Sequence, residues 1–421
     1  MPHLWQATVV AALALLACTP TWADEPGGDL RLHWDARDTN PAGPVSAAQS
    51  LAPGIAPPAR SAAVAELALR GAWSMHPSVT LAADALLLAA HPEGGTTAHE
   101  ARFNELQASA DLGAWQASAG KKVVGWDVGY GFRPNDMVQQ EVRRTLLETR
   151  PEGRPLLQVE HFGAESAAAL VWVNPQRLND PADTQRFGTE SALAARGYHR
   201  TGAVDWHVFA RQGRHTGSSL GAALAWVASD ALELHASART QQRHDGWHLD
   251  DAAGTAPVAT SPWQVRTLGA ATQALLGATW TGEHRQSLIA EWWHDGTALS
   301  DGDWERWQAR NTALLAQGTR PGLAAASAGN LAWQAGPFAA TSLRRDNLFL
   351  RAAWQADPWQ AWADVLVTPA DAGRVVTTGL QWQGDALRVT ATLRRFGGPA
   401  GAVTAQLPQR HTGVLAASWT W

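Results

Sequence analysis

The chain has 421 residues, of which 45% are hydrophobic and 17% charged, with a formal net charge of −5 and a mean hydropathy of −0.21. This composition excludes an intrinsically disordered chain, because the apolar fraction is ample and the net charge is small. It also excludes a helical membrane protein, because beyond the N-terminus every apolar run is interrupted well before the roughly 18 residues that a spanning helix needs.

The N-terminus predicts an export signal. Residues 7–18 form an apolar stretch, and Ala23 ends a small-x-small triplet that signal peptidase accepts. We expect residues 1–23 to be a signal peptide and residues 24–421 to form a single exported domain. The chain's one cysteine, Cys18, also fits the end of a lipoprotein signal, and the sequence leaves open whether it is lipidated or removed.

Alternation of apolar and polar residues dominates the rest of the chain. Leu232 and Leu234, for example, alternate with Glu233 and His235, as in a strand with one apolar and one wet face. We predict eighteen strands, with sixteen as the alternative. They cover residues 29–37, 62–75, 79–91, 99–112, 115–125, 155–163, 165–174, 189–199, 203–212, 218–229, 231–243, 263–281, 284–294, 345–355, 358–368, 374–384, 386–396 and 411–421. Within 263–281, Gln264 stands at a position where the alternation calls for an apolar residue. This predicts a bulge, or a strand that enters the membrane later.

The connections between these strands differ systematically in length. Those after even-numbered strands are tight turns, whereas most of those after odd-numbered strands are long and rich in Gly, Pro and Asp, the longest being 126–154 and 295–344. Short turns on one rim and long loops on the other are typical of outer-membrane barrels, whereas a soluble sandwich has no reason to sort its loops. We therefore predict an all-β fold, a closed antiparallel transmembrane β-barrel with long extracellular loops.

Tryptophan placement gives a second indication, since amphipathic indoles settle at membrane interfaces. Many of the 23 tryptophans fall on the apolar parity close to a short turn or the C-terminus, which predicts an aromatic girdle. Its members are Trp73, Trp115, Trp206, Trp226, Trp280, Trp354, Trp359, Trp382, Trp419 and Trp421. The alternative, core tryptophans of a soluble protein, does not explain why they gather at one end of the strands.

The last residues, 411–421 (HTGVLAASWTW), alternate and end on an aromatic residue. This segment resembles the terminal strand of Gram-negative outer-membrane proteins, which the barrel-assembly machinery recognises, although Trp421 stands where that family usually has Phe. Over the whole mature chain the architecture resembles the porins, and residues 120–138 are similar to a stretch in several poorly characterised proteobacterial barrels. The resemblance implies an outer-membrane location in contact with lipid and lipopolysaccharide, and leaves a homo-oligomer open.

Barrels of roughly 16–18 strands leave an aqueous lumen. We therefore expect a passive channel for small hydrophilic solutes, with the polar alternate residues of the strands lining the pore. The basic residues on this parity are Arg31, Arg70, Lys122, Arg211, Arg239, Arg243, Arg345, Arg351, Arg388 and Arg394. The acidic ones are Glu66, Asp84, Glu105, Asp111, Glu160, Asp205, Glu233, Glu291 and Asp364. Opposed charged walls would create a transverse field across a constriction; alternatively, these charges only solvate the lumen and pair across strands.

Two loops are candidates for narrowing the pore. Porins fold a segment into the lumen, and by that resemblance the loop 126–154 is the first candidate for the constriction. Its charged residues are Asp127, Arg133, Asp136, Glu141, Arg143 and Arg144. In the loop 295–344, Ser300 and Asp301 have the pattern of a helix N-terminus, and Gly318 ends a run of helix formers, so a short helix is expected over the mouth.

The sequence favours no enzyme. His161 and His199 fall on the apolar parity at the short-turn ends of their strands, far from outer-leaflet substrates. A rim set of His244, His248, Asp250 and Asp251 has the residue types that bind a cation or activate water, but such residues in one loop are usually only solvated. We expect no catalytic residues, cofactor, metal or nucleic acid. The alternatives are a barrel component of a secretion or surface-assembly system and, less favoured, an outer-rim hydrolase.

Overall fold

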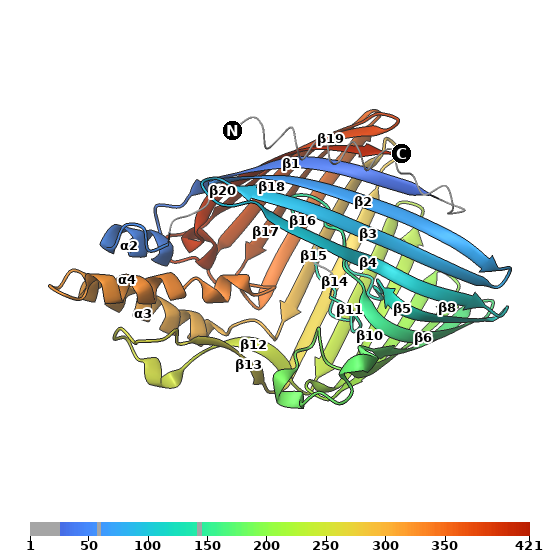
Figure 1. Cartoon of the computed structure of the whole chain (residues 1–421), viewed down its shortest axis with the longest axis horizontal. Coiled ribbons are helices and arrows are strands. Elements are labelled where there is room, and N and C mark those ends of the chain that lie inside the picture. Colours follow the sequence, from blue (N-terminus) through green and yellow to red (C-terminus); the bar gives the residue numbers. More distant parts are fainter. Residues whose placement is uncertain (1–25, 57–59, 141–144) are drawn as a thin grey trace.

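The computed structural model describes residues 26–56, 60–140 and 145–421; the predicted signal peptide and its cleavage site lie outside them. Eighteen antiparallel strands form one sheet, and β1 (Gly27–Thr39) pairs with both β2 (Ser61–His76) and β20 (Gln409–Thr420), so the sheet closes on itself (Figure 1). Closure leaves no unpaired strand edge, which is the condition for crossing lipid with strands. The prediction of a closed antiparallel barrel is confirmed, with eighteen strands rather than sixteen.

The other barrel strands follow one another around the wall in sequence order. They are β3 (Val79–Pro92), β4 (Ala98–Asp111), β5 (Trp115–Lys122), β6 (Arg154–Phe162), β7 (Ser166–Val173), β8 (Ala192–Thr201), β9 (Val204–Gly213), β10 (Gly217–Ser229), β11 (Leu232–Gln241), β14 (Ala271–Thr281), β15 (Gln286–Asp295), β16 (Asp346–Ala356), β17 (Trp359–Thr368), β18 (Gly373–Gln383) and β19 (Leu387–Gly397). Both ends of the barrel chain lie at the short-turn rim, where Gly28 and Trp421 exchange two backbone hydrogen bonds of 3.1 Å.

The segment predicted as one strand, 263–281, is two separate strands. β13 (Trp263–Leu268) pairs with β12 (His244–Leu249) in a small sheet outside the barrel, and the barrel strand β14 starts only at Ala271. β14 pairs with β11 without a register shift. The expectation of a later entry is therefore correct and the alternative of a bulge is wrong. The polar residues that broke the apolar parity belong to the hairpin, which faces water.

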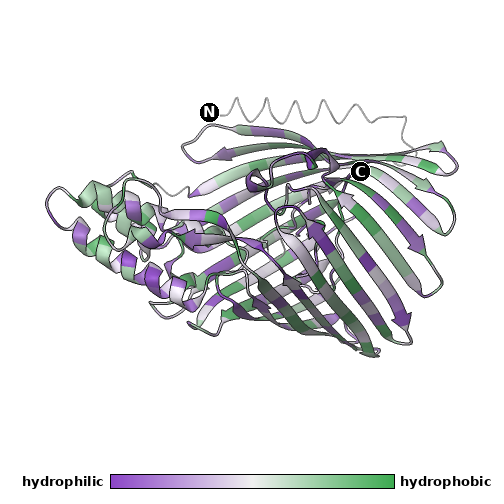
Figure 2. Cartoon of the chain, turned by 90° about the horizontal axis from the view of Figure 1, so that it is seen from below, coloured by the Kyte–Doolittle hydropathy of each residue, from purple (hydrophilic) through white to green (hydrophobic). Residues whose placement is uncertain are grey.

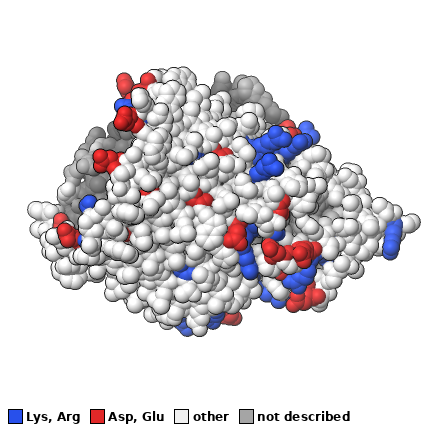
Figure 3. Space-filling view, turned by 180° about the vertical axis from the view of Figure 1, so that it is seen from behind, with Lys and Arg blue, Asp and Glu red and all other residues white. Residues whose placement is uncertain are grey.

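The outward face of the barrel is apolar and exposed. Leu350, Leu393 and Leu415 lie mid-strand on the outward parity and are 44%, 55% and 54% exposed. Hydrophobic and hydrophilic bands alternate along the strands in Figure 2, and in Figure 3 few charged side chains lie over the middle of the surface. Exposed apolar side chains on strand after strand form a surface far larger than a soluble monomer presents, so this face is suited to lipid.

The predicted girdle tryptophans stand on this outward parity near the short-turn ends of their strands. Those exposed by more than two-fifths of their surface are Trp115, Trp206, Trp226, Trp280, Trp354, Trp359 and Trp419. Trp73, Trp382 and Trp421 are half-buried. An indole at such a position has its ring against the apolar band and its N–H near the polar rim, as interfacial tryptophans do.

Three helices form a cluster beyond the long-loop rim (Figure 1): α2 (Pro44–Leu51), α3 (Asp301–Gly318) and α4 (Ala324–Trp333). They pack through Ala48, Leu314, Ala328 and Leu331, all almost fully buried. Short 3-10 turns complete the loops: η1 (Pro175–Arg177), η2 (Ala182–Thr184), η3 (Asp251–Ala253), η4 (Gly336–Ala339) and η5 (Val403–Gln406). Within the described part of the chain, no helix has the length and apolar character that crossing a membrane requires.

The predicted helix in the loop 295–344 is present as α3. The Ser300 hydroxyl accepts a hydrogen bond from the Asp303 backbone N–H at 3.2 Å, and the Asp303 carboxylate accepts one from the Ser300 N–H at 2.9 Å. This reciprocal capping box fixes where the helix begins. The buried Arg310 donates to the carbonyls of Ala253 and Gly254, at 2.9 and 2.6 Å, which ties α3 to the loop that carries β12 and β13.

Candidate functional site: the inward loop and the lumen wall

The connection from β5 to β6 is described over residues 123–140 and 145–153, which run inside the barrel, and its first part packs against one side of the wall. Trp126, Met137 and Val138 are buried in a cluster with lumen-facing side chains of β6, β7 and β9, including Phe209 and Val171. Trp126 stacks on Phe209 with ring centroids 6.3 Å apart. Apolar residues on the inward face of this sector therefore form a core with the inward loop and do not line water.

Hydrogen bonds anchor the inward loop to β10 and β11. The Asp127 carboxylate accepts hydrogen bonds of 2.7 and 2.9 Å from the Ser237 hydroxyl. The Asn135 amide donates to the same hydroxyl at 2.8 Å and to the Ala238 carbonyl at 3.1 Å. A Cβ at Gly221 would lie 1.8 Å from the Asn135 side chain, so glycine on β10 is needed for the loop to approach this closely.

The tip of the inward loop is held by a buried carboxylate on β15. Glu291 is 3% exposed and accepts hydrogen bonds from the backbone N–H groups of Tyr130 and Gly131, at 2.6 and 2.7 Å. His235 lies 3.0 Å from the same carboxylate. Tyr130 then stacks on Phe349 of β16 at 5.9 Å. Glu291, predicted as a pore-lining acid, acts here as the anchor of the tip.

The returning part of the inward loop reaches the opposite wall. Arg150 pairs with Asp29 of β1 and lies 3.6 Å from Glu66 of β2. Arg31 of β1 donates to the Glu148 carbonyl at 2.6 Å. The loop thus touches β1, β2, β10, β11, β15 and β16. The described parts of the loop therefore reach both sides of the interior.

Three of the predicted constriction residues lie together inside this loop. Arg133 donates to the Asp127 carbonyl at 2.5 Å and lies 3.2 Å from the Asp136 carboxylate. Burial raises the pKa of Asp136 to about 6, against the opposing charge of Arg133 and with a further contribution from Asp127. Burial also raises the pKa of Asp127. The other three, Glu141, Arg143 and Arg144, lie outside the described residues.

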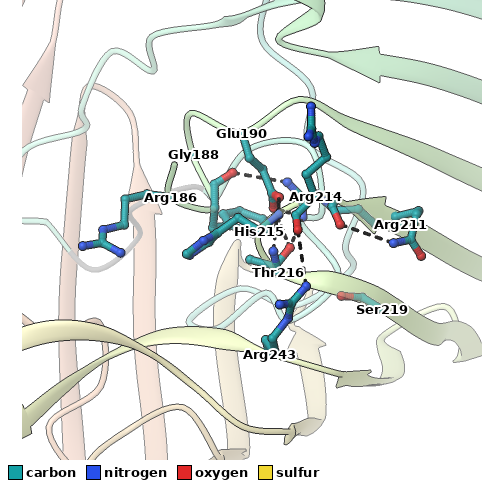
Figure 4. Close-up of polar contacts among 12 residues, drawn as sticks. Arg186, Gly188, Glu190, Arg211, Arg214, His215, Thr216, Ser219 and Arg243 are labelled. Atoms are coloured by element: carbon teal, nitrogen blue, oxygen red, sulfur yellow. Dashed lines mark hydrogen bonds and ion pairs between the residues drawn. The ribbon is translucent and has the colours of Figure 1, made fainter. Parts of the chain in front are cut away.

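A second loop, 174–191, is anchored by a carboxylate that the sequence did not single out. Glu190 accepts hydrogen bonds from the Arg211 guanidinium at 2.6 Å and from the backbone N–H groups of His215 and Thr216 at 2.7 and 3.2 Å (Figure 4). Both side chains of the Glu190–Arg211 pair are at most 1% exposed. Nothing in the local pattern marks Glu190, because its partner lies on a strand 21 residues later.

Arg211 and Arg239, predicted to line the pore, are held inside protein. Their guanidinium carbons lie 4.3 and 5.3 Å from the centre of the Phe187 ring. Arg239 also donates to the Pro134 carbonyl of the inward loop at 3.1 Å. These two residues are 3% and 2% exposed, so they join the two loops to the wall and do not face open water.

The remaining predicted pore residues are mostly paired with neighbours. On β1 to β6, Arg70 lies 4.0 Å from Asp29, Glu66 lies 3.2 Å from Arg31, and Lys122 lies 3.9 Å from Glu160. Asp84 accepts from Asn104 at 3.0 Å, and Glu105 accepts from the Val123 N–H at 2.8 Å. Further round, Asp205 accepts from the Tyr198 hydroxyl at 2.7 Å, Glu233 lies 3.6 Å from His235, and Arg351 lies 3.3 Å from Asp364. Some of these charges therefore pair with a residue of a neighbouring strand, as Arg31 does with Glu66 and Arg351 with Asp364, whereas Glu233 and His235 lie on the same strand.

Four further predicted basic residues donate hydrogen bonds to uncharged groups. Arg243 and Arg345 bond loop carbonyls at the long-loop rim, at 3.3 and 3.1 Å, and Arg388 bonds Gln383 at the short-turn rim. Arg394, on β19, donates to the Thr377 hydroxyl at 3.0 Å. Of this group Arg394 is the one that lies in mid-strand.

The rim histidines and aspartates do not converge on a common centre. His244 lies 2.9 Å from the Gly269 carbonyl, Asp250 accepts from the Ala252 N–H at 3.1 Å, and Asp251 pairs with Arg306 at 2.9 Å. His161 packs against Trp115 with ring centroids 4.6 Å apart. Across the described ranges, no group of three or more His, Cys, Asp or Glu side chains is placed to hold a metal ion.

The chain was compared with known proteins at the level of families, curated sequences and solved structures. No model of a protein family and no curated protein matches it. Among solved structures, two engineered mutants of the porin of Rhodopseudomonas blastica align at 10% identity, over 94% of this chain and 99% of theirs, with TM-scores of 0.45 and 0.44. A structure titled for the asymmetric conductivity of engineered proteins aligns at 10% identity, over the same shares, with a TM-score of 0.43. At this identity and TM-score the likeness carries no argument about function, which must come from the geometry of the chain.

Proposed function

We propose that this protein is a passive channel in the outer membrane of a Gram-negative bacterium, which passes small hydrophilic solutes through a charged aqueous lumen. The observation that carries the proposal is the closed barrel of eighteen strands, apolar and exposed outside, with polar residues on its inner face. Barrels of this width leave an aqueous interior unless it is filled. The inward loop narrows the interior and is hydrogen-bonded in place, which makes it the proposed constriction.

Open space remains on the long-loop side of the interior. One cavity of about 410 Å³ is lined by Phe132 and Arg133 of the inward loop together with Gln241 and Asp245. Another, of about 400 Å³, lies against β16 to β19. Both are lined in part by Ala340 and Thr341, so they are neighbours separated by one loop segment. Spaces of this size accommodate small organic solutes.

The orientation and partners form part of the same proposal. The long loops would face the cell exterior, the signal peptide would be removed after Ala23, and the C-terminal strand would be read by the barrel-assembly machinery. Arg374 and Arg395 are exposed on the outward face at the long-loop ends of β18 and β19, where lipopolysaccharide phosphates would lie. Lys121, also on the outward parity, pairs with Glu152 of the inward loop. An ionic group close to an interface costs little compared with one at midplane.

Liposome swelling tests the function. Purified protein reconstituted into liposomes should admit sugars at rates that fall steeply with sugar size, because the inward loop limits the passage. Protein denatured by boiling before reconstitution is the control. If no small solute enters, the proposed channel function is wrong, and a secretion or surface-assembly role is favoured instead.

A further inference from the structure

Two arginines on the outward face of the barrel stand next to each other at the long-loop rim. Arg374 of β18 and Arg395 of β19 are both exposed, and they are diagonal neighbours, because Arg374 pairs with Gly397 and Arg395 with Val376. Diagonal neighbours on adjacent strands lie about 7–8 Å apart, so their long side chains can reach the same point. Like charges this close at a membrane border repel each other unless an anion lies between them.

The described part of the chain supplies no such anion. Across those residues, neither of the two guanidinium groups forms an ion pair. Asp38 of β1 and Asp346 of β16 are the carboxylates that flank the pair at this rim, and each lies two strands from the nearer arginine. They pair instead with His411 at 3.1 Å and His294 at 3.0 Å. A counter-ion for the two arginines is therefore expected from outside the chain.

A shallow groove of about 430 Å³ lies in the apolar outer surface beside Arg395, and its eleven lining residues are all uncharged. It follows two cross-strand rows on β18, β19, β20 and β1, of which the first lies two residues, or about 7 Å, from Arg395 toward the short-turn rim. The first row includes Leu393, Gly413 and Ala36, and the second includes Leu380, Ala391 and Leu415.

The shape of the groove follows from the sizes of these side chains. Gly413, Ala36 and Ala391 stand between leucines on the neighbouring strands, which leaves a hollow in the surface. Inside a membrane, binding depends on close van der Waals contact, because lipid chains are as apolar as leucine. A hydrocarbon chain in the hollow touches protein on more sides than a chain on the flat surface around it.

The arginines and the groove together define the chemistry of a ligand. Guanidinium groups bind phosphate through paired, charge-assisted hydrogen bonds. The groove begins within reach of the same molecule and lies in the apolar band, so that molecule also carries a hydrocarbon chain. A phosphate joined to acyl chains is the head of a membrane lipid, and the proposed function places this rim at the outer leaflet, where lipopolysaccharide lies.

We propose that this surface is a defined site for one molecule of lipid A, with a phosphate between Arg374 and Arg395 and an acyl chain in the groove. The two positive charges match the phosphate, and the uncharged hollow matches the chain. This inference rests on the proposed function, which sets the orientation of the barrel, and it narrows a general contact with lipopolysaccharide to one place on the wall.

Native mass spectrometry of the purified barrel in detergent micelles tests the site with three probes. Lipid A carries phosphate and chains, phosphatidylethanolamine carries chains with a net-neutral headgroup, and inorganic phosphate has no chain. Lipid A should saturate at one molecule per barrel, at concentrations roughly tenfold lower than phosphatidylethanolamine, and equal concentrations of phosphate should not displace it. Equal retention of the two lipids, or displacement by phosphate, overturns the proposal. Dimers or trimers without bound lipid A would place a second copy on this face and overturn it as well.

Two arginine variants test the phosphate contact. Arg374→Gln and Arg395→Gln should each raise the lipid A concentration for half-saturation by roughly tenfold, the usual weight of a hydrogen bond to a charged group. Arg410→Gln is the matched control, because Arg410 is exposed at the same rim of β20 but shares the inward parity of Thr412, which pairs with Arg394. If the control weakens binding as much as the two variants, the assignment is wrong.

A third variant tests the groove. A Cβ at Gly413 would lie 3.7 and 3.8 Å from its nearest atoms, which is ordinary contact, so Gly413→Leu fills the hollow without displacing the wall. It should weaken lipid A binding by roughly threefold through loss of chain contact. Ala417→Leu adds the same kind of side chain to the same face of β20 outside the groove and should have no effect. Equal behaviour of the two leucine variants contradicts the site.

The outcomes separate this inference from the proposed function. A heat-modifiable gel shift first shows that each variant is folded, and Gly413→Leu with its control carries the test if an arginine variant does not fold. Current steps in KCl from a barrel that does not prefer lipid A contradict the site and leave the channel intact. A preference for lipid A without any current steps supports the site and contradicts the channel.

Discussion

Glu291→Gln is the substitution that most directly probes the inward loop. The carboxylate accepts two backbone hydrogen bonds, from Tyr130 at 2.6 Å and from Gly131 at 2.7 Å, in a site that is 3% exposed. A glutamine of the same shape retains one acceptor oxygen and turns an N–H₂ group toward the other backbone N–H. The tip then loses one charge-assisted hydrogen bond and keeps a buried donor without an acceptor.

The size of the effect follows from these contacts. A hydrogen bond to a charged group contributes about 1.5–3 kcal/mol, and a buried unsatisfied donor costs about 1–3 kcal/mol. Taking about 3 kcal/mol in total, the equilibrium for release of the tip shifts by roughly a hundredfold. The barrel wall should remain closed, because the ladder bonds of β15 to its neighbours are backbone bonds that the substitution does not remove.

Hydrogen exchange and single-channel recording together measure this change. Amides of residues 126–138 should lose protection by about two orders of magnitude, and the open-channel current should become larger or noisier as the tip moves. Glu233→Gln is the matched control, because Glu233 lies on the lumen face of β11 with its side chain 43% exposed, and its ion pair within the described residues is with His235 at 3.6 Å. If Glu291→Gln and wild type give equal protection and equal current noise, the loop is not held by this carboxylate.

Three further predictions concern the lipid face, the capping of α3 and the buried Asp136. Leu350→Arg places a charge on the outward face in mid-strand and should destabilise the barrel in lipid vesicles by about 2–4 kcal/mol, measured by urea unfolding, whereas the inward-facing Ala353→Arg should cost much less. Ser300→Ala removes half of the capping box and should cost α3 about 1 kcal/mol, seen as faster proteolysis within 296–345 while the barrel stays heat-modifiable. The pKa of Asp136 is raised to about 6 in the folded state from an ordinary 3.8, so the folded state binds the proton more tightly than the unfolded state. The resulting contribution to stability is present below pH 4 and is lost as the pH rises through 6. Asp136→Asn should flatten the dependence of the unfolding temperature on pH between 4 and 7, and an unchanged slope would show that another group titrates.

The strands were largely predictable, because each buries one face and exposes the other to a single environment. The alternation of apolar and polar residues therefore predicts the strands, and the pairing of β1 with β20 closes the sheet as expected. The segment 263–281 failed as a single strand because its first part, β13, pairs in a hairpin outside the barrel. Alternation indicates a two-faced strand but does not tell which sheet the strand joins.

The helices show the same division between local and tertiary causes. Ser300 and Asp301 have the local pattern of a helix N-terminus, from which α3 is predicted, and in the structure Asp303 completes the cap. The helix α4 has no such cap and is held by packing of Ala328 and Leu331 against α2 and α3. No local pattern in the sequence indicates that packing. For α2, Pro44 at the first helical position is a weak local signal of a helix N-terminus.

The charged residues of the interior were found by parity, but their roles were not. Parity placed Arg211, Arg239 and Glu291 on the inner face, yet each is covered by a loop that approaches from elsewhere in the sequence. Glu190 was missed altogether because its pairing with Arg211 exists only after the loop 174–191 folds inward. Loop paths depend on contacts distant in sequence, and a strand pattern contains no information about them.

The central claim is that alternate residues of one strand face water inside the barrel and lipid outside. Two adjacent positions on β19 test it, because the one cysteine of the chain, Cys18, belongs to the predicted signal peptide. Thr390 lies on the lumen face and Ala391 on the outward face. During planar-bilayer recording of the reconstituted protein, a membrane-impermeant thiol reagent should reduce the current stepwise for Thr390→Cys and leave Ala391→Cys unchanged. Equal reaction at both positions, or reaction at Ala391→Cys alone, would contradict the account.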